Sequence, residues 1–316
     1  MRQFTATKAQ RRKLKARIGL TGATNTGKTY TALRIGAGLL ISEGYVTENN
    51  EPDWSKIAVI DTERERSLFY ANDGTIGEFI HIPFDPPYDP KSYIDAVTYA
   101  ESLGVQVCII DSLSHAWNGT GGVLEIVNEL TEKSKSKNQF NAGWGGKEGG
   151  TALQNSMINE ILSTKMHIIC TFRQKMEYVQ EKDEMNGRTI IRKVGTKTVQ
   201  RDDLEYEFDI TLKLDNDHSA EIIKNTVKFL GNKEESLPMI TEEFGKLLGD
   251  YLNSGIDIEE YQKVQKESIK NNIKALGTQF PPLYEYFKTS NPGKSLDDLS
   301  LDELNALQKT FNNMLG

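Results

Sequence analysis

The fold is decided by the stretch Gly22-Ala23-Thr24-Asn25-Thr26-Gly27-Lys28-Thr29. This stretch matches the pattern G-x-x-x-x-G-K-[ST] in full, and it lies between a short apolar run, 18–20, and a segment with helical spacing, 28–41. Gly22 and Gly27 permit a close approach of the backbone that a side chain would block. Backbone N–H groups of such a loop, and the positive end of the following helix, favour phosphate. The stretch therefore predicts a phosphate-binding loop between a strand and a helix.

Two residues at the end of the loop carry further chemistry. In loops of this kind the lysine, here Lys28, reaches the β- and γ-phosphates, and the hydroxyl of Thr29 binds Mg²⁺. Downstream, the apolar run 107–110 ends in Asp111, and a carboxylate in that place holds Mg²⁺ in P-loop NTPases. An aspartate after a strand is more often a turn residue, but the loop upstream favours the metal role. The sequence thus predicts a site for ATP and Mg²⁺, to which we also assign Tyr30.

The first two-thirds of the chain alternate strand and helix signals. Continuous apolar strands joined by helical segments are typical of a parallel sheet covered on both faces, so we expect an α/β fold. After residue 171 the pattern changes, and Asn186-Gly187 between extended segments predicts a hairpin. The expected strands are 18–20, 56–60, 78–82, 105–110, 167–171, 207–214 and 220–229, and the expected helices are 28–41, 93–103, 122–133 and 151–164.

A second carboxylate is expected beside the phosphate loop. Asp61-Thr62-Glu63 follows the strand 57–60, and ligands of parallel sheets bind beyond the carboxyl ends of the strands. Glu63 should therefore face the same crevice as Lys28 and Asp111, where it can orient and polarise an attacking water. The alternative is a surface acid in a charged turn.

The order of phosphate loop, Asp-x-Glu and strand-Asp resembles the core of RecA-type recombinases. In that family the glutamate activates water, and a tyrosine seven residues later stacks on adenine; the matching positions here are Glu63 and Tyr70. Over about residues 15–250 the chain is similar to phage-encoded ATPases of the RecA-like or AAA type that act as single-strand annealing recombinases. The sequence segments on which this resemblance rests are Ile60-Asp-Thr-Glu63, Ile110-Asp-Ser-Leu-Ser-His115-Ala-Trp117, Thr171-Phe-Arg173-Gln-Lys175 and Tyr206-Glu-Phe-Asp209.

The resemblance also implies roles further along the chain. RecA-like proteins place a polar γ-phosphate sensor after the strand that follows the magnesium strand, and here both Arg173 and Gln174 are candidates for it. Lys224 matches the first of two basic residues that RecA supplies across a subunit interface, whereas Thr226 occupies the second position. The resemblance implies a ring or filament of identical chains with ATP between neighbours.

Two polar loops, which we expect to leave the same edge of the sheet, are candidates for contact with single-stranded DNA. Lys135–Gly150 is rich in glycine and carries Trp144 and Lys147, and Lys175–Arg201 is a charged hairpin. Cations that follow the backbone and rings that stack on bases suit single strands, and the corresponding RecA loops contact DNA. The opposing interpretation is that these loops are only mobile and solvated, since four acidic residues dilute the charge of the second. The basic candidates of the second loop are Arg188, Arg192, Lys193, Lys197 and Arg201.

Composition sets limits on partners and location. The net charge of −7 gives the whole chain no attraction to DNA, so binding must come from local patches. Residues 1–17 carry seven Lys or Arg and no acid, which fits either a phosphate-binding arm or a solvated terminus. Cys108 and Cys170 lie in apolar runs, so we expect buried thiols rather than a disulfide or a metal site. No apolar run reaches the roughly 18 residues of a membrane span, so a cytoplasmic protein is expected.

The chain is expected to divide into a basic segment, 1–17, an ATPase core, 18–252, and a small helical domain, 255–316. In the last of these, helical spacing covers 257–276, 283–289 and 301–314, and Ser300 with Glu303 forms a capping box.

The leading interpretation is an ATP-hydrolysing phage recombination protein that anneals or pairs single-stranded DNA, with a single-strand DNA-binding protein as a candidate partner. The enzyme alternative is a RecA-fold helicase or loader, although no further helicase motif is visible in the sequence. The alternative from another class is a nucleotide-switched protein that hydrolyses ATP slowly and recruits partners through residues 255–316. Stimulation of ATP turnover by single-stranded DNA separates the first from the third, and unwinding of a tailed duplex identifies the second.

Overall fold

The computed structural model describes residue 9 and residues 11–134, 142–182, 189–227 and 235–315, without the side chains of 178–194 and 258–262. The chain forms two compact units, of which the larger comprises residues 14–253 and the smaller comprises 254–316 with the residues before Leu14. The larger unit contains the phosphate loop.

One sheet forms the centre of the larger unit. In the described residues its nine strands are β1 Arg17–Gly22, β2 Ile57–Asp61, β3 Ile80–Pro83, β4 Val107–Asp111, β5 His167–Lys182, β6 Thr189–Thr198, β7 Ile210–Leu214, β8 Ala220–Asn225 and β9 Ser236–Leu237. Their order in space is β3-β2-β4-β5-β1-β7-β8-β9, and β6 pairs with β5. The pairings from β3 to β7 are parallel, whereas β8, β9 and β6 add antiparallel pairs. The predicted α/β fold with a mostly parallel sheet is confirmed.

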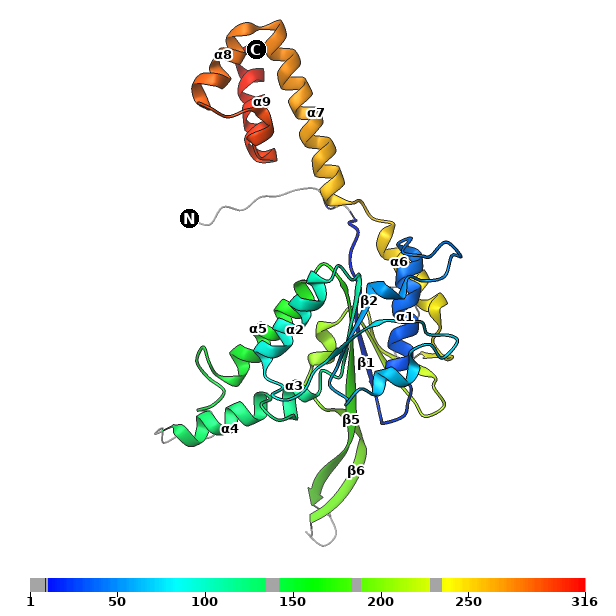
Figure 1. Cartoon of the computed structure of the whole chain (residues 1–316). Coiled ribbons are helices and arrows are strands. Elements are labelled where there is room, and N and C mark those ends of the chain that lie inside the picture. Colours follow the sequence, from blue (N-terminus) through cyan, green and yellow to red (C-terminus); the bar gives the residue numbers. More distant parts are fainter. Residues whose placement is uncertain (1–8, 10, 135–141, 183–188, 228–234, 316) are drawn as a thin grey trace. The chain divides into compact units, whose positions relative to one another are not determined.

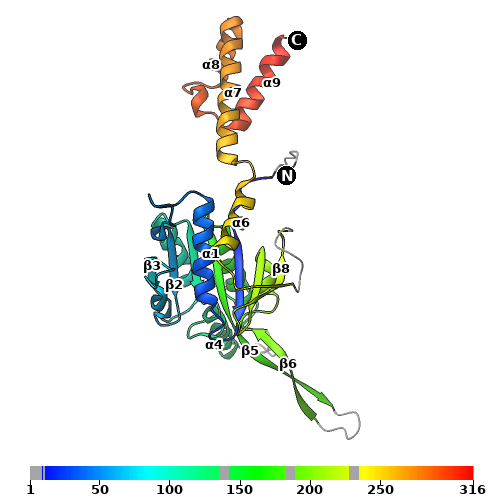
Figure 2. The same cartoon turned by 90° about the vertical axis from the view of Figure 1, so that its right-hand side faces the viewer.

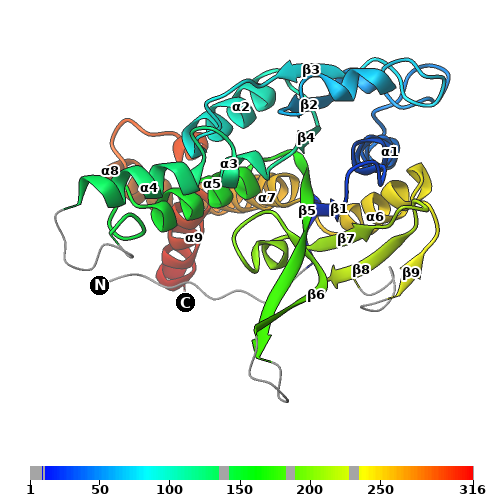
Figure 3. The ribbon, with the colours of Figure 1, turned by 90° about the horizontal axis from the view of Figure 1, so that it is seen from below.

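Helices cover both faces of the sheet. They are α1 Lys28–Ser42, α2 Pro90–Ser102, α3 His115–Asn118, α4 Val123–Lys133, α5 Gly150–Ser163 and α6 Glu242–Asn253. Figure 1 and Figure 3 show α1 and α6 on one face and α2, α3, α4 and α5 on the other. Each face has its own apolar core, and the side chains of β4 alternate between them: Ile109 belongs to the core under α1, and Ile110 belongs to the core under α2 and α5. Both cysteines are buried free thiols, as expected.

Helix α6 was not predicted, and it packs unusually close to α1. The contact depends on glycine, because a Cβ on Gly38 would lie 2.0 Å from the carbonyl oxygen of Glu242, and one on Gly245 would lie 2.1 Å from that of Ile35. Arg34 of α1 also donates two hydrogen bonds to the Glu242 carboxylate, at 2.8 and 2.6 Å. The position of α1, and hence of the phosphate loop that precedes it, is fixed by this packing.

The strand β5 is much longer than the predicted 167–171. It runs to Lys182 and pairs antiparallel with β6 from Gln174↔Thr198 to Lys182↔Thr189, so the predicted hairpin is confirmed in its two arms. Figure 2 shows this hairpin projecting beyond the rest of the sheet. Further along, the predicted strand 207–214 begins later than expected, because a 3₁₀ helix occupies 204–207.

The smaller unit contains the predicted helices as α7 Ile258–Gln279, α8 Pro281–Ser290 and α9 Leu301–Leu315. Phe287 and Phe311 are buried in its own apolar core. The predicted capping box is confirmed, since Ser300 N–H donates to Glu303 Oε2 at 2.7 Å and Glu303 N–H donates to Ser300 Oγ at 3.2 Å.

Among the described residues, none of the helices combines the length and the apolar character that crossing a membrane requires.

Candidate nucleotide site

The phosphate loop connects β1 to α1, and its conformation requires small residues. Gly22 has no room for a side chain, because a Cβ there would lie 2.8 Å from a backbone carbonyl oxygen of β7. Gly27 has a φ of 85° and Asn25 a φ of 66°, in the left-handed region that glycine and asparagine tolerate best. The Thr26 hydroxyl donates to the Ala23 carbonyl at 3.0 Å and closes the loop on itself. The residues of the loop that stay exposed are Ala23, Thr24 and Asn25.

Lys28 directs its ammonium group back over the loop. Its Nζ donates to the carbonyl oxygens of Gly22 at 3.0 Å and Ala23 at 2.7 Å. Burial lowers the pKa of Lys28, and the nearby carboxylates of Asp111 and Glu63 oppose that shift. The ammonium group therefore lies where phosphate oxygens can replace the two carbonyl acceptors.

Asp111, at the end of β4, is buried next to the first turn of α1. Thr29 Oγ1 donates to its Oδ2 at 2.5 Å, and Thr171 Oγ1 donates to its Oδ1 at 2.5 Å. Burial raises the pKa of Asp111, and these two hydrogen bonds oppose the shift. A buried carboxylate in contact with a hydroxyl offers the hard oxygen ligands that Mg²⁺ prefers, and Mg²⁺ commonly takes only one or two protein ligands beside phosphate. Thr29 and Asp111 therefore fit Mg²⁺.

Glu63 also lies in this site, although its carboxylate is already engaged. Arg173 donates from Nε to Oε1 at 2.6 Å and from Nη2 to Oε2, and Ser112 Oγ donates to Oε1 at 3.0 Å. Burial pushes the pKa of Glu63 up, but the Arg173 hydrogen bond and charge bring it below its ordinary value. The turn that carries Glu63 is held by Asp61, which accepts from Glu63 N–H at 2.7 Å and from Ser67 Oγ at 2.6 Å.

Lys28, Thr29, Glu63, Asp111 and Arg173 line one cavity of about 110 Å³. Tyr70 lines it as well, and its ring packs against that of Tyr30 with the centroids 5.4 Å apart. Tyr30 thus touches this site through Tyr70. The residues that line the cavity are Thr24, Asn25, Gly27, Lys28, Thr29, Glu63, Arg66, Tyr70, Asp111 and Arg173.

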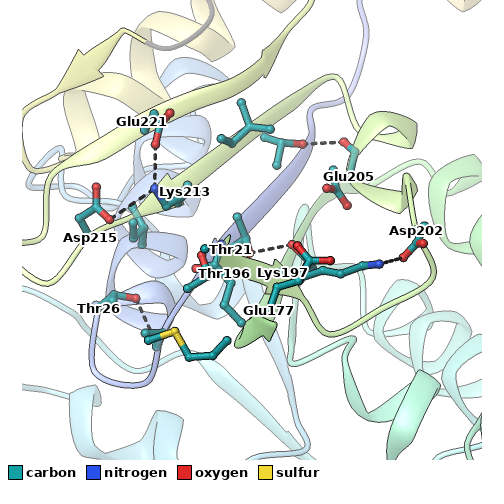
Figure 4. A pocket seen from close by; sticks show the side chains of 18 of the residues that line it. Thr21, Thr26, Glu177, Thr196, Lys197, Asp202, Glu205, Lys213, Asp215 and Glu221 are labelled. Atoms are coloured by element: carbon teal, nitrogen blue, oxygen red, sulfur yellow. Dashed lines mark hydrogen bonds and ion pairs between the residues drawn. The ribbon is translucent and has the colours of Figure 1, made fainter. Parts of the chain in front are cut away.

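Of the two candidate sensors, the structure brings only Arg173 into this cavity. Gln174, the next residue of β5, lines a separate groove of about 920 Å³ between β6, β7 and the outer side of the phosphate loop. The physical reason is that successive side chains of a strand point to opposite faces. Figure 4 shows this groove, where the Lys213 ammonium forms ion pairs with Glu221 and Asp215. Gln174 therefore does not line the described phosphate cavity, and its contact with the γ-phosphate stays a prediction.

Lys224 lies on β8 and is not among the residues that line the described part of the phosphate cavity. Its Nζ donates to the carbonyl oxygens of Tyr206 and of Phe208, the latter at 2.5 Å. Because the predicted role of Lys224 is toward the nucleotide of a neighbouring chain, that role stays a prediction.

The DNA-binding candidates are dispersed. Trp144 is half-buried and packs on Trp117 with ring centroids 5.7 Å apart, whereas Lys147 is exposed. Lys197 pairs with Asp202 at 2.6 Å. The segment that carries Trp144 joins α4 to α5, and the expectation that it leaves the same sheet edge as the hairpin stays a prediction. Arg201 donates to Asn155 at 2.5 Å, and Arg188 and the side chains of Arg192 and Lys193 lie outside the described residues.

Sequence reasoning missed four contributors to the site. Arg66 lines the cavity, and Thr171 anchors Asp111. Ser112 contacts Glu63, and Thr62 contacts Ser112 in turn. Two of these residues, Thr62 and Ser112, directly follow the aspartate that ends a strand, and that adjacency is the signal that could have identified them.

Comparison with known proteins identifies the family of this chain. No match was found among curated proteins. A family model described as "AAA domain" matches residues 14–236, which include the phosphate loop, Glu63, Asp111 and Arg173. Because that match covers more than half of the sequence and contains the whole cavity, the chain belongs to the AAA domain family, a family of P-loop ATPase-like domains.

Proposed function

We propose that this protein is a Mg²⁺-dependent ATPase that acts on single-stranded DNA during phage recombination, by annealing or pairing strands. The observation that carries the proposal is the convergence of Lys28, Glu63 and Asp111 on one cavity behind a complete phosphate loop. General-base, phosphate-binding and metal-binding groups are then within reach of one bound nucleotide.

The residues of the cavity divide the work of hydrolysis. The loop backbone and Lys28 bind and orient the phosphates, and Tyr70, which lines the same cavity, stacks on the base. Mg²⁺, held by Thr29 and Asp111, would supply positive charge to the phosphate oxygens. Glu63 orients the attacking water, which requires that Arg173 first release the carboxylate that it now binds. The guanidinium group that leaves Glu63 is well placed to pair with the γ-phosphate.

The DNA part of the proposal is supported by the course of β5. This strand runs from the wall of the cavity at Arg173 directly into the hairpin that projects from the sheet. Among the described basic side chains there, Lys197 is neutralised by Asp202, so the support comes from the hairpin's position rather than from that charge. Rings or filaments of this chain, with Lys224 directed at a neighbour's nucleotide, and a single-strand DNA-binding protein as partner, belong to the same proposal.

One experiment tests the proposal. ATP turnover is measured with and without single-stranded DNA, in wild type and in Glu63→Gln, while particle size is followed by light scattering. We expect turnover that DNA stimulates and that the substitution removes. ATP turnover without DNA binding or annealing would overturn the DNA part, and no turnover under any condition would overturn the ATPase part.

A second candidate is a nucleotide-switched binding protein with slow turnover. It is favoured by one observation, the engagement of both Glu63 oxygens by Arg173. In that case ATP binding alone changes the pairing of Arg173, and turnover stays slow whether or not DNA is present.

A further inference from the structure

The turn that follows β4 contacts both Glu63 and Arg173. It comprises residues 112–115, Ser-Leu-Ser-His, and leads into α3. The inference drawn from it rests on the proposed ATPase function, because it concerns the residue that would activate water.

Ser112 is the direct link between this turn and Glu63. Its side chain is buried, and its Oγ donates to Glu63 Oε1 at 3.0 Å. The backbone of Ser112 is itself fixed, since its carbonyl oxygen accepts from Tyr93 Oη at 3.0 Å and its N–H donates to Thr62 Oγ1 at 2.8 Å. The backbone from which the hydroxyl extends is therefore held in place beside the carboxylate.

His115 holds Thr62, the middle residue of Asp61-Thr62-Glu63. Thr62 Oγ1 accepts from Ser112 N–H, so its own proton must go to another acceptor. That acceptor is the Ser112 carbonyl oxygen at 3.1 Å, and His115 Nδ1 lies 2.7 Å from the same hydroxyl oxygen. The Thr62 hydroxyl is thus held from two sides, by the Ser112 backbone and by the His115 ring.

The surroundings of His115 hold its ring in place and favour its neutral form. Its ring stacks on that of Tyr88, with centroids 4.9 Å apart and planes 20° from parallel. Burial lowers the pKa of His115; Glu63 opposes this shift, and Arg173 and Arg64 add to it. A neutral imidazole carries one ring proton, and its tautomer decides whether Nδ1 donates to or accepts from Thr62 Oγ1.

The same turn also fixes the strand that carries Arg173. Ser114 Oγ accepts from the backbone N–H of Arg173 at 3.0 Å, and the backbone N–H of Leu113 donates to the carbonyl oxygen of Thr171 at 3.0 Å. The turn therefore contacts both members of the Glu63–Arg173 pair, through Ser112 and Ser114 respectively.

We propose that Ser112 and His115 are positioning residues that hold the Glu63 carboxylate for water activation. Ser112 occupies Oε1, and Arg173 reaches both Oε1 and Oε2. When Arg173 leaves, Oε2 is open while Oε1 remains held. In the reaction the water oxygen bonds to the γ-phosphorus, the bond to the bridging oxygen breaks, and the water proton passes to Oε2 as ADP departs.

The test separates positioning from folding. Ser112→Ala removes the hydrogen bond to Glu63 and leaves the volume almost unchanged. We expect kcat for ATP to fall about 10- to 100-fold, which is the range for one hydrogen bond to a charged group, with KM within twofold of wild type. Ser42→Ala is the matched control, because its hydroxyl donates to a backbone carbonyl at the far end of α1; it should retain wild-type kcat.

His115 is tested by a pair of variants. His115→Asn keeps a hydrogen-bonding amide near the place of Nδ1 and should retain a kcat within about threefold of wild type, whereas His115→Leu should lose about tenfold or more. Binding of a fluorescent ATP analogue and the thermal midpoint are measured for each variant. If His115→Leu does not fold, Ser112→Ala and His115→Asn decide the question.

The outcomes distinguish this inference from the proposed function. If wild type does not hydrolyse ATP, the proposed function fails. If wild type hydrolyses ATP and Ser112→Ala shows an unchanged kcat, or raises KM alone, the positioning role is refuted. Equal loss in His115→Asn and His115→Leu would refute the assigned role of Nδ1.

Discussion

Replacing Glu63 by Gln is the most informative single change in the cavity. Glutamine keeps the size of the side chain and can still accept the Ser112 hydrogen bond at 3.0 Å, so the fold of the site should be preserved. It cannot take a proton from water, and it carries no charge for Arg173 to pair with. Two effects of opposite sign are therefore expected, one on turnover and one on ATP binding.

The structure sets the size of each effect. General acid–base catalysis contributes a factor of roughly 10² to 10⁴, about 3–5.5 kcal/mol, so kcat should fall by at least 100-fold. The resting Glu63–Arg173 pair is only partly shielded, since the Arg173 side chain is 46% exposed, and a pair of this kind is worth about 1 kcal/mol. Without the Glu63 carboxylate, Arg173 is free to pair with phosphate. The dissociation constant for ATP should therefore fall by up to about fivefold.

Steady-state turnover and titration with a fluorescent ATP analogue measure the two effects separately. Glu65→Gln is the control, because Glu65 is exposed in the same charged turn and does not line the described part of the cavity. It should match wild type in both assays. Weaker ATP binding in Glu63→Gln with an unchanged kcat would refute the reasoning, since it would make Glu63 a binding residue rather than the group that activates water.

Three further predictions address the loop, the packing and the dependence of stability on pH. Lys28→Ala should abolish detectable ATP binding or turnover in the same two assays, and unchanged turnover would contradict the site. Gly38→Ala should destabilise the larger unit by about 2 kcal/mol or more in urea unfolding, because its Cβ would lie 2.0 Å from a carbonyl oxygen of α6, whereas Gly145→Ala, with open space around it, should be neutral. Burial acts to raise the pKa of Glu43, but a hydrogen bond from His167 helps to lower it to about 2. A depressed carboxylate pKa stabilises the fold above the ordinary value of 4.5, so this contribution should disappear as the pH falls from about 4.5 to about 2, and Glu43→Gln should remove that part of the pH dependence.

Much of the fold could be predicted from the sequence because the strands of the parallel sheet are buried on both faces. A strand such as β4 reads as an uninterrupted apolar run, Val107–Ile110, and ends at a carboxylate. The helix α1 was located by the loop before it. The helix α6 was overlooked because its packing against α1 depends on Gly38 and Gly245, and glycine inside a helix lowers the local helix signal.

The sequence predicted those site residues that a single motif identifies, but not the contacts between residues far apart in the chain. Lys28, Thr29 and Asp111 follow from residue type and from their place at the ends of elements. The pairing of Glu63 with Arg173 does not follow, because 110 residues separate them and only the parallel register of the sheet brings β2 and β5 to one edge. Similarly, nothing in the local sequence shows that Lys197 is paired with Asp202.

Arg173 and Gln174 are neighbours in the chain, but Arg173 lines the phosphate cavity and Gln174 lines the separate groove. A deletion of one residue in β5 before this pair would move Gln174 to the position that lines the phosphate cavity, whereas an insertion there would move Arg173 to the position that lines the groove behind the loop. Two chains of this fold that differ by a single gap in β5 can thus contact the γ-phosphate with chemically different side chains. Alignment of this strand by register, rather than by residue identity, is therefore the sound basis for transferring a phosphate-sensing role to or from this protein.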